Sequence, residues 1–325
     1  MDWRKEYAEK IVSVEEAVRH VQSGNRIVFT HACGEAQALT DELVRQADRL
    51  ENVEIVHMVA MGKAPYCQPG MEKHFRHNAL FVGGSTRKAV EEGRGDYTPC
   101  FFHEIPKLFT DGTLPVDVAF LQLSEPDENG VCSYGVSVDY TQPAAEAAKL
   151  VIAQINKNMP YTYGNGINLK DIDYIVEKDE PLIELQPPKI GETEHKIGEY
   201  VASLIHDGDT LQLGIGAIPD AVLSFLGDKK DLGIHSEMFS DGVVDLARKG
   251  VITNKKKTID QGKFVSCFLM GTKKLYDFVN NNPDVLMERV DYTNDPFVVA
   301  KIDNIISINS AMQVDLMGQV NAEMI

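Results

Sequence analysis

Residues 232–242 read LGIHSEMFSDG, a short apolar run that ends on one carboxylate, Glu237, and continues into a Ser-Asp-Gly turn. A buried strand that carries an ionisable group to the rim of a sheet has this pattern. Farther upstream, residues 211–219 read LQLGIGAIP, which predicts a second strand followed by a glycine loop. The loops after neighbouring parallel strands lie at one edge of a sheet, where open α/β folds bind ligands. We therefore expect Glu237 to lie beside the glycine loop, where a carboxylate can act as a covalent nucleophile.

Helical and strand patterns alternate along the rest of the chain. Helical patterns at residues 14–18 and 39–47 are interleaved with strand patterns at 26–29 and 53–56. This alternation predicts an α/β fold with parallel sheets covered by helices. A chain of 325 residues is too long for one small core and suits two domains.

The strongest domain boundary lies at residues 185–189, LQPPK, where two prolines are followed by a polar stretch. We therefore predict an N-terminal domain at 1–186 and a C-terminal domain at 187–325. The same order of elements occurs on both sides of this boundary: a helix end, a glycine, a buried strand, a small-residue loop, a helix and a second strand. The matched segments are 21–29 with 205–213, 36–39 with 220–223, and 55–58 with 234–237. Two similar open α/β halves would face each other across a cleft, which is a preferred place for a ligand site.

The bulk composition narrows the class of protein. The chain has 32 Lys and Arg against 49 Asp and Glu, a net charge of -17, which disfavours nucleic acid and anionic membranes as partners. Its five cysteines are scattered without a C-x-x-C pair, as expected for reduced thiols. The N-terminus has no apolar signal core, and no apolar run is long enough to cross a bilayer. We expect a soluble cytoplasmic protein that forms a homo-oligomer, with a dimer as the first choice because two-fold symmetry is the most common.

Several site types lack their sequence signatures. The histidines and cysteines do not have metal-ligand spacing, so we predict no metal site. The G-x-x-x-x-G-K-[ST] phosphate loop and the G-x-S-x-G nucleophile elbow are both missing. The pair Gly214 and Gly216 is a weak dinucleotide signature because the third glycine is absent and Pro219 stands nearby. These glycines would let backbone amides approach an anionic ligand at a helix N-terminus, although a tight turn without a ligand has the same pattern.

Each polar candidate, including Glu237, also has an ordinary structural explanation. Glu237 could be a solvated strand-end carboxylate. Asn309 follows the apolar run at 305–308 and could donate to an oxyanion or cap a turn. Residues 83–88, GGSTRK, could bind an anion or only cap a helix. His31 ends the first strand of its half and could line the cleft, or simply be packed and hydrogen-bonded. We assign His31 and Gln212 to the substrate pocket.

The chain as a whole resembles the acetyl-CoA hydrolase/transferase family, and within it the branch of 4-hydroxybutyrate or butyrate:acetate CoA-transferases. The segments that carry the resemblance extend from one end of the chain to the other. They are FVGGSTR at 81–87, DYTP at 96–99, SVDYT at 137–141, LGIGAIP at 213–219, GIHSEM at 233–238 and INSAMQVD at 308–315.

The resemblance implies two CoA-transferase domains of similar α/β fold with the active site between them. It implies that Glu237 becomes a glutamyl-CoA thioester and that Asn309 donates to an oxyanion. It also implies that the glycine loop contacts CoA, through Gly214, Ile215, Gly216, Ala217 and Ile218. Coenzyme A and acyl-CoA would then be substrates, and no cofactor would be bound permanently. The short-chain carboxylate would be butyrate, 4-hydroxybutyrate or acetate.

One departure from the family concerns the end of the chain. Members of the family continue with a further glycine-rich loop, whereas this sequence runs only to residues 321–325, NAEMI. We therefore expect a truncated second domain or a fragment. We predict a CoA-transferase that uses Glu237. The alternatives are an acyl-CoA hydrolase that uses the same Glu237 and a CoA-binding protein without turnover.

Overall fold

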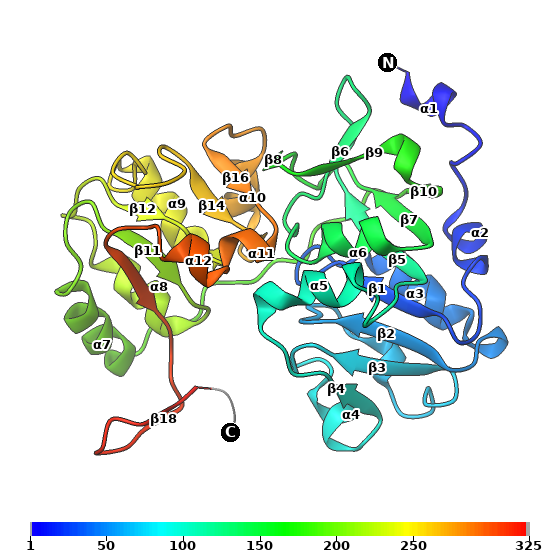
Figure 1. Cartoon of the computed structure of the whole chain (residues 1–325), viewed down its shortest axis with the longest axis horizontal. Helices are drawn as coiled ribbons and strands as arrows, with labels where there is room; N and C mark the ends of the chain where they lie inside the picture. The colour runs from blue at the N-terminus through cyan, green and yellow to red at the C-terminus, as the bar shows by residue number, and fades with distance from the viewer. Residues whose placement is uncertain (1, 323–325) are drawn as a thin grey trace.

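The computed structural model describes residues 2–322. Its largest sheet has seven strands in the order β10-β7-β5-β1-β2-β3-β4 (Figure 1). Every pairing within this sheet is parallel. Its strands are β1 (Arg26–Phe29), β2 (Val53–His57), β3 (Phe75–Ala79), β4 (Gly95–Tyr97), β5 (Val118–Leu123), β7 (Leu150–Ile155) and β10 (Tyr174–Glu177).

Helices cover both faces of this sheet because both faces of its strands are apolar. On β1, Ile27 and Phe29 belong to a buried cluster with residues of α2 (Val14–Arg19) and α3 (Gln37–Arg45). Val28 points to the opposite face and packs with residues of α5 (Ile105–Thr110) and α6 (Thr141–Ala147). This alternation is the two-residue period of a strand, and it explains why the strands read as continuous apolar runs. Two shorter helices complete this half, α1 (Trp3–Glu6) and α4 (Arg87–Glu91).

The second half is built around β11 (Thr210–Leu213), which pairs in parallel with β17 (Ile305–Ile308) and with β12 (Gly233–Ile234). It also meets β13 (Met238–Phe239) in an antiparallel contact, and β13 pairs in parallel with β15 (Phe268–Leu269). The helices of this half are α7 (Glu192–Ala202), α8 (Ala217–Ser224), α9 (Asp241–Arg248), α10 (Lys273–Val279), α11 (Val290–Thr293) and α12 (Pro296–Val299).

Three smaller sheets complete the fold. A parallel sheet joins β14 (Phe264–Ser266), β16 (Val285–Met287) and β8 (Tyr163–Gly164), so a strand from the first half pairs with the second. Two antiparallel pairs are formed by β6 (Val131–Ser133) with β9 (Gly166–Asn168) and by β18 (Gln313–Val314) with β19 (Val320–Asn321). Of the expected chain end at 321–325, residues 323–325 lie outside the described residues.

The predicted α/β class with parallel sheets is confirmed. The predicted repeat is present locally, because β1, α3 and β2 have the same order as β11, α8 and β12, and both strand pairs are parallel. The preceding turns match as well, since Gly24 and Gly208 have φ values of 79° and 85°, which favour glycine. The halves differ in the antiparallel contact between β11 and β13, which has no counterpart in the first sheet.

The predicted boundary at 186/187 lies in the segment 178–191, which contains no helix or strand. The two halves are nevertheless tied together by backbone hydrogen bonds away from this segment. Val138 N donates to Cys267 O at 3.0 Å, and Leu269 N donates to Val136 O at 2.8 Å. The division into two domains therefore stays a prediction. Within residues 2–322, no helix has the length and apolar character needed to span a membrane.

Candidate active site

Glu237 lies in a bend between β12 and β13, and not at the end of one strand as its sequence pattern predicts. Its carbonyl oxygen accepts hydrogen bonds from the consecutive amides of Cys267 and Phe268, at 3.0 and 3.1 Å. The Ser236 hydroxyl bridges the same bend, accepting from Leu213 N at 2.9 Å and donating to Met238 O at 2.6 Å. The Glu237 carbonyl therefore accepts from two amides, and the Ser236 hydroxyl takes the place of a backbone partner for Leu213 N. These irregular contacts separate β12 from β13 at Glu237.

The side chains of the site gather on one face of the second sheet. Gln212 pairs in register with Ser307, and Asn309 lies two residues farther along the same strand direction, so the strand period places all three on one face. Residues from the turn after α11 and from α12 cover this face. Together they enclose a cavity of about 210 Å³, lined by Gln212, His235, Glu237, Thr293, Asn294, Val299, Ile305 and Ser307.

The carboxylate of Glu237 is held by one amide. Asn294 Nδ2 donates to Glu237 Oε2 at 2.7 Å. Burial raises the pKa of Glu237, and the hydrogen bond from Asn294 and the nearby charge of His31 oppose this shift. The charge of Asp139 adds to the increase in pKa. Glu237 is therefore a partly desolvated carboxylate whose charged form depends on a few neighbours.

Asn294 is a site residue that its local sequence does not reveal. It follows α11 in a polar stretch, TNDP at 293–296, where an asparagine ordinarily reads as a turn or cap. Its contact with Glu237 spans 57 positions of the chain. The only signal in the sequence is an Asn next to an Asp-Pro turn, and this signal does not point to a carboxylate so far away.

Asn309 lies next to the cavity but is bonded to other side chains. Its Nδ2 donates to Gln212 Oε1 at 2.8 Å and to Ser307 Oγ at 3.0 Å, and the residue is exposed. Gly214 lies beside it, directly after β11, where a Cβ atom would come within 2.7 Å of Asn309 Oδ1. A side chain at position 214 would therefore displace the Asn309 amide.

The glycine loop forms the predicted turn from strand to helix. Gly214 N donates to Ile308 O at 2.8 Å, and α8 begins at Ala217 and contains Ile218. Gly216 precedes this helix with φ 120°, a conformation that other residues rarely adopt. Ile215, between the two glycines, is exposed. The loop therefore requires glycine at 216 for backbone reasons and at 214 for contact with Asn309.

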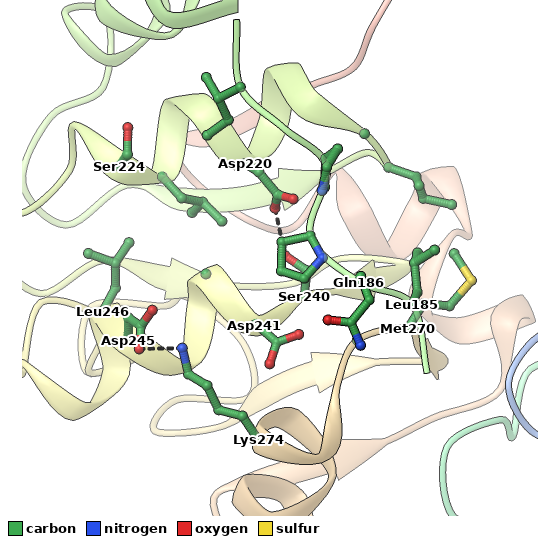
Figure 2. A pocket seen from close by; sticks show the side chains of 18 of the residues that line it. Leu185, Gln186, Asp220, Ser224, Ser240, Asp241, Asp245, Leu246, Met270 and Lys274 are labelled. Carbon is green, nitrogen blue, oxygen red and sulfur yellow. Dashed lines mark hydrogen bonds and ion pairs between the residues drawn. The ribbon is translucent and has the colours of Figure 1, made fainter. Parts of the chain in front are cut away.

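A larger cavity of about 550 Å³ lies beside the glycine loop (Figure 2). It is bordered by residues 185–190, the loop at 214–216, and side chains of α8, α9 and α10. Figure 2 shows Asp220 bonded to Ser240, whose Oγ donates to Asp220 Oδ1 at 2.8 Å, and Lys274 paired with Asp245 at 2.5 Å. Burial raises the pKa of Asp220. Glu237 opens onto the smaller cavity rather than this one.

His31 comes from the first half of the chain and lies at the junction with the second. It is buried, and its Nδ1 lies 2.8 Å from Asp139 Oδ2. Its ring centroid is 4.5 Å from that of Phe268, the residue whose amide bonds the Glu237 carbonyl. Asp139 also accepts hydrogen bonds from Ser137 Oγ at 2.9 Å and from Tyr140 N at 2.6 Å. The fold thus brings His31 close enough to Glu237 to affect its pKa.

In the GGSTRK segment at 83–88, residues 84–86 form a turn, and Arg87 and Lys88 begin α4. Ser85 Oγ donates to Ala60 O at 2.7 Å. Neither of the two cavities described above is lined by it. All five cysteines are free thiols, and burial raises the pKa of Cys33 to about 11. In the described part of the chain, no group of three or more His, Cys, Asp or Glu side chains is placed to hold a metal ion.

Comparison with known proteins gives a consistent result. Residues 1–186 match the model of the acetyl-CoA hydrolase/transferase N-terminal domain, and residues 271–325 match that of the C-terminal domain. The chain is 63% identical to the 4-hydroxybutyrate coenzyme A transferase of Clostridium kluyveri over 100% of its own length and 76% of the relative.

Solved structures agree with this match. The 4-hydroxybutyrate CoA-transferase of Porphyromonas gingivalis has a TM-score of 0.88 and 44% identity, covering 98% of this chain and 77% of the other. RipA from Yersinia pestis has a TM-score of 0.95 and 33% identity, covering 99% of this chain and 78% of the other. The chain thus spans about three quarters of the length of each of these proteins.

Proposed function

The chain belongs to the acetyl-CoA hydrolase/transferase family, and from this premise we propose that it is a CoA-transferase in which Glu237 carries CoA between a short-chain acyl-CoA and a free carboxylate. The observation that carries the proposal is the position of Glu237, a desolvated carboxylate at a rigid bend that opens onto a small cavity. Desolvation strengthens a carboxylate as a nucleophile, and the cavity would take a short acyl chain. Butyrate, 4-hydroxybutyrate and acetate are the proposed acyl groups.

The reaction would proceed in two half-reactions. A Glu237 oxygen attacks the thioester carbonyl, CoA leaves as the thiolate, and a mixed anhydride remains. The thiolate then attacks the Glu237 carbonyl carbon, releasing the first carboxylate and leaving a glutamyl-CoA thioester. A second carboxylate attacks that same carbon and forms a new anhydride, and the released thiolate attacks the new acyl carbon. The energy of the thioester is retained throughout, first in the mixed anhydride, then in the enzyme-CoA thioester and then in the second anhydride.

We assign Asn309 to the oxyanion on the substrate's acyl carbon, because its amide lies beside the cavity and donates to the side chains of Gln212 and Ser307 rather than to the backbone of the sheet. Each such donor contributes roughly 3–4 kcal/mol to the transition state. Gln212, whose Oε1 accepts from Asn309 Nδ2 at 2.8 Å, would position Asn309. His31 is buried and lines neither of the two cavities, so its assignment to the substrate pocket stays a prediction.

The glycine loop at 214–218 is the proposed CoA contact. Gly214 lines the larger cavity and lies next to Asn309. Asn309 is hydrogen-bonded to Gln212, which lines the smaller cavity, so Gly214 and Asn309 lie between the two cavities. Residues 185–190 add Leu185, Pro187, Pro188 and Ile190 to the lining, an apolar surface suited to the uncharged arm of CoA. The thiol end would then reach Glu237 past Gly214.

The test is mass spectrometry of the protein after exposure to butyryl-CoA, with the peptide that contains Glu237 isolated. A CoA adduct on Glu237 that added acetate releases as acetyl-CoA is the expected result. Free CoA without an adduct would establish hydrolysis instead, and saturable binding of CoA with neither adduct nor turnover would establish a CoA-binding protein. Glu288→Gln is the matched control, because Glu288 is another partly buried glutamate bonded to an asparagine, Asn165, at 2.9 Å.

A further inference from the structure

The amide of Asn294 touches only one of the two reactive oxygens of Glu237. Its Nδ2 lies 2.7 Å from Oε2. A carboxylate that becomes acylated uses one oxygen as the nucleophile and keeps the other as a carbonyl oxygen. Because Oε2 is held, Oε1 is the oxygen free to attack, and Oε2 becomes the carbonyl oxygen of the anhydride and of the thioester.

The turn that carries Asn294 is fixed on both sides. Asn294 N donates to Val290 O at 2.9 Å, which closes α11, and the next residue, Asp295, caps α12 through Phe297 N at 2.7 Å. Thr293 O lies 2.9 Å from His235 Nε2. On its other side α11 contacts α5 and the 3-10 turn Phe102–Glu104 of the first half. The amide is therefore preorganised, which is the condition for electrostatic stabilisation of a developing charge.

The proposed reaction passes through two kinds of tetrahedral centre. When Glu237 or a thiolate attacks the acyl carbon, the oxyanion forms on the substrate. When the CoA thiolate or a carboxylate attacks the Glu237 carbonyl carbon, the oxyanion forms on a Glu237 oxygen instead. The Asn309 amide donates to Gln212 and Ser307, not to Glu237. Among the described residues, Asn294 is the side chain that donates a hydrogen bond to the Glu237 carboxylate.

We propose that Asn294 is a further catalytic residue, the donor that stabilises the oxyanion on Oε2 during every attack at the Glu237 carbonyl carbon. This inference rests on the proposed function, because it requires the glutamyl-CoA thioester. In each such step the incoming sulfur or oxygen forms a bond to the carbonyl carbon, and the electron pair of the C=O bond moves to Oε2. The electron pair returns to the C=O bond as the carboxylate or thiolate leaves. Asn294 donates a hydrogen bond to Oε2 during this step and keeps its proton.

The experiment isolates chemistry at Glu237 from chemistry at the substrate. The protein is loaded with CoA by prolonged incubation with butyryl-CoA, freed of excess reagent and checked for the adduct by mass. Hydroxylamine then attacks the glutamyl thioester, forming a hydroxamate on Glu237 and releasing CoA as the measured thiol. This step involves no substrate acyl carbon.

Asn294→Ala is expected to slow this release about 10²–10³-fold, the loss found when one oxyanion donor is removed. Asn165→Ala removes an equivalent asparagine-glutamate bond at Glu288 and is expected to release CoA at the parent rate. Asn309→Ala is expected to slow butyryl transfer more than it slows hydroxylamine attack. Equal release rates for Asn294→Ala and the parent protein would overturn the assignment.

Asn294→Asp keeps the shape of the side chain and guards against a loss caused by misfolding. An ionised carboxyl at this position cannot donate and repels the oxyanion, whereas a protonated one donates. Hydroxylamine is itself protonated at low pH, so each rate is compared with that of the parent at the same pH. Relative release of CoA is expected to be lost at neutral pH and to recover as the pH falls, whereas a purely structural role predicts the same impairment at every pH. If the parent protein forms no CoA adduct, the proposed function itself fails, and the role of Asn294 fails with it.

Discussion

Glu237 combines a raised pKa with a proposed role that requires its charged form. Burial raises its pKa, so this carboxyl takes up a proton at a higher pH than an ordinary glutamate. The charged groups that act on it are His31 and Asp139, and the amide of Asn294 is its direct partner. The nucleophile is lost as the pH falls through this raised pKa.

We therefore predict that kcat/KM falls on the acid side at a pH above the usual range of a glutamate. Asn294→Ala removes a hydrogen bond that favours the charged form, so the fall is expected to begin at a still higher pH. The pH dependence of butyryl-CoA turnover measures both. A fall at the ordinary pKa of glutamate would contradict the raised pKa.

The same raised pKa makes a prediction about stability. An acid whose pKa is higher in the folded protein costs stability wherever it is charged, and the cost disappears as the pH falls below the pKa of the unfolded chain. Glu237→Gln removes this cost while keeping the bond from Asn294 through its own oxygen. We expect Glu237→Gln to melt at a higher temperature than the parent at neutral pH and to lose activity on the order of 10⁶-fold, as when a covalent nucleophile is removed. Calorimetry in parallel with turnover measures both, and a lower melting temperature would contradict the prediction.

Asp139 is the most heavily bonded carboxylate near the site. It is fully buried and accepts hydrogen bonds from His31, Ser137 and Tyr140. Removing one partner of a buried pair leaves the other unpaired and costs about 3–5 kcal/mol. We predict this loss in the free energy of unfolding for Asp139→Ala, measured by urea denaturation. A loss below about 1 kcal/mol, the range of exposed pairs, would show that the pair is not structural.

At the scale of the element, the turn from β11 to α8 depends on two glycines for different reasons. Gly216 has φ 120°, and a side chain there is strained by about 1–3 kcal/mol. Gly214 instead leaves room for Asn309, because a methyl group added at position 214 would lie 2.7 Å from Asn309 Oδ1.

We accordingly predict that Gly216→Ala lowers the free energy of unfolding by this amount. Gly214→Ala is expected to reduce kcat for butyryl transfer by displacing Asn309, with a smaller effect on stability. Gly84→Ala is the control, since no atom lies within 4 Å of its added methyl group. Urea denaturation and steady-state kinetics on the three variants test both statements. A Gly214→Ala variant with unchanged kcat would contradict the proposed role of Asn309.

At the scale of the whole molecule, one segment of the first half bonds the strand that supports Glu237. Val138 N and Asp139 N both donate to Cys267 O. Cys267 N in turn donates to Glu237 O, so Cys267 links the first half to the backbone of Glu237. The largest buried cluster contains residues from both halves, including Trp3 and Leu211. The geometry of the nucleophile therefore depends on the junction between the halves.

This junction predicts that the chain unfolds as one cooperative unit. The chain has a single tryptophan, Trp3, so its fluorescence reports on the first half, whereas far-ultraviolet circular dichroism reports on all helices and strands. Coincident urea transitions by the two probes are expected. Two separated transitions would show that the halves unfold independently.

Features that depend on neighbouring residues could be predicted from the amino-acid sequence. The two-residue and 3.6-residue periods identified the α/β class, and glycines at 24 and 208 identified the repeated turns, because backbone preference is a property of neighbouring residues. The run at 211–219 likewise identified the turn between β11 and α8. Only the tertiary structure placed Asn294 on Glu237, across 57 positions, and Asp139 on His31, across 108 positions. It also showed that Glu237 lies in a bend, because that bend is made by hydrogen bonds from Cys267 and Phe268, which no local pattern encodes.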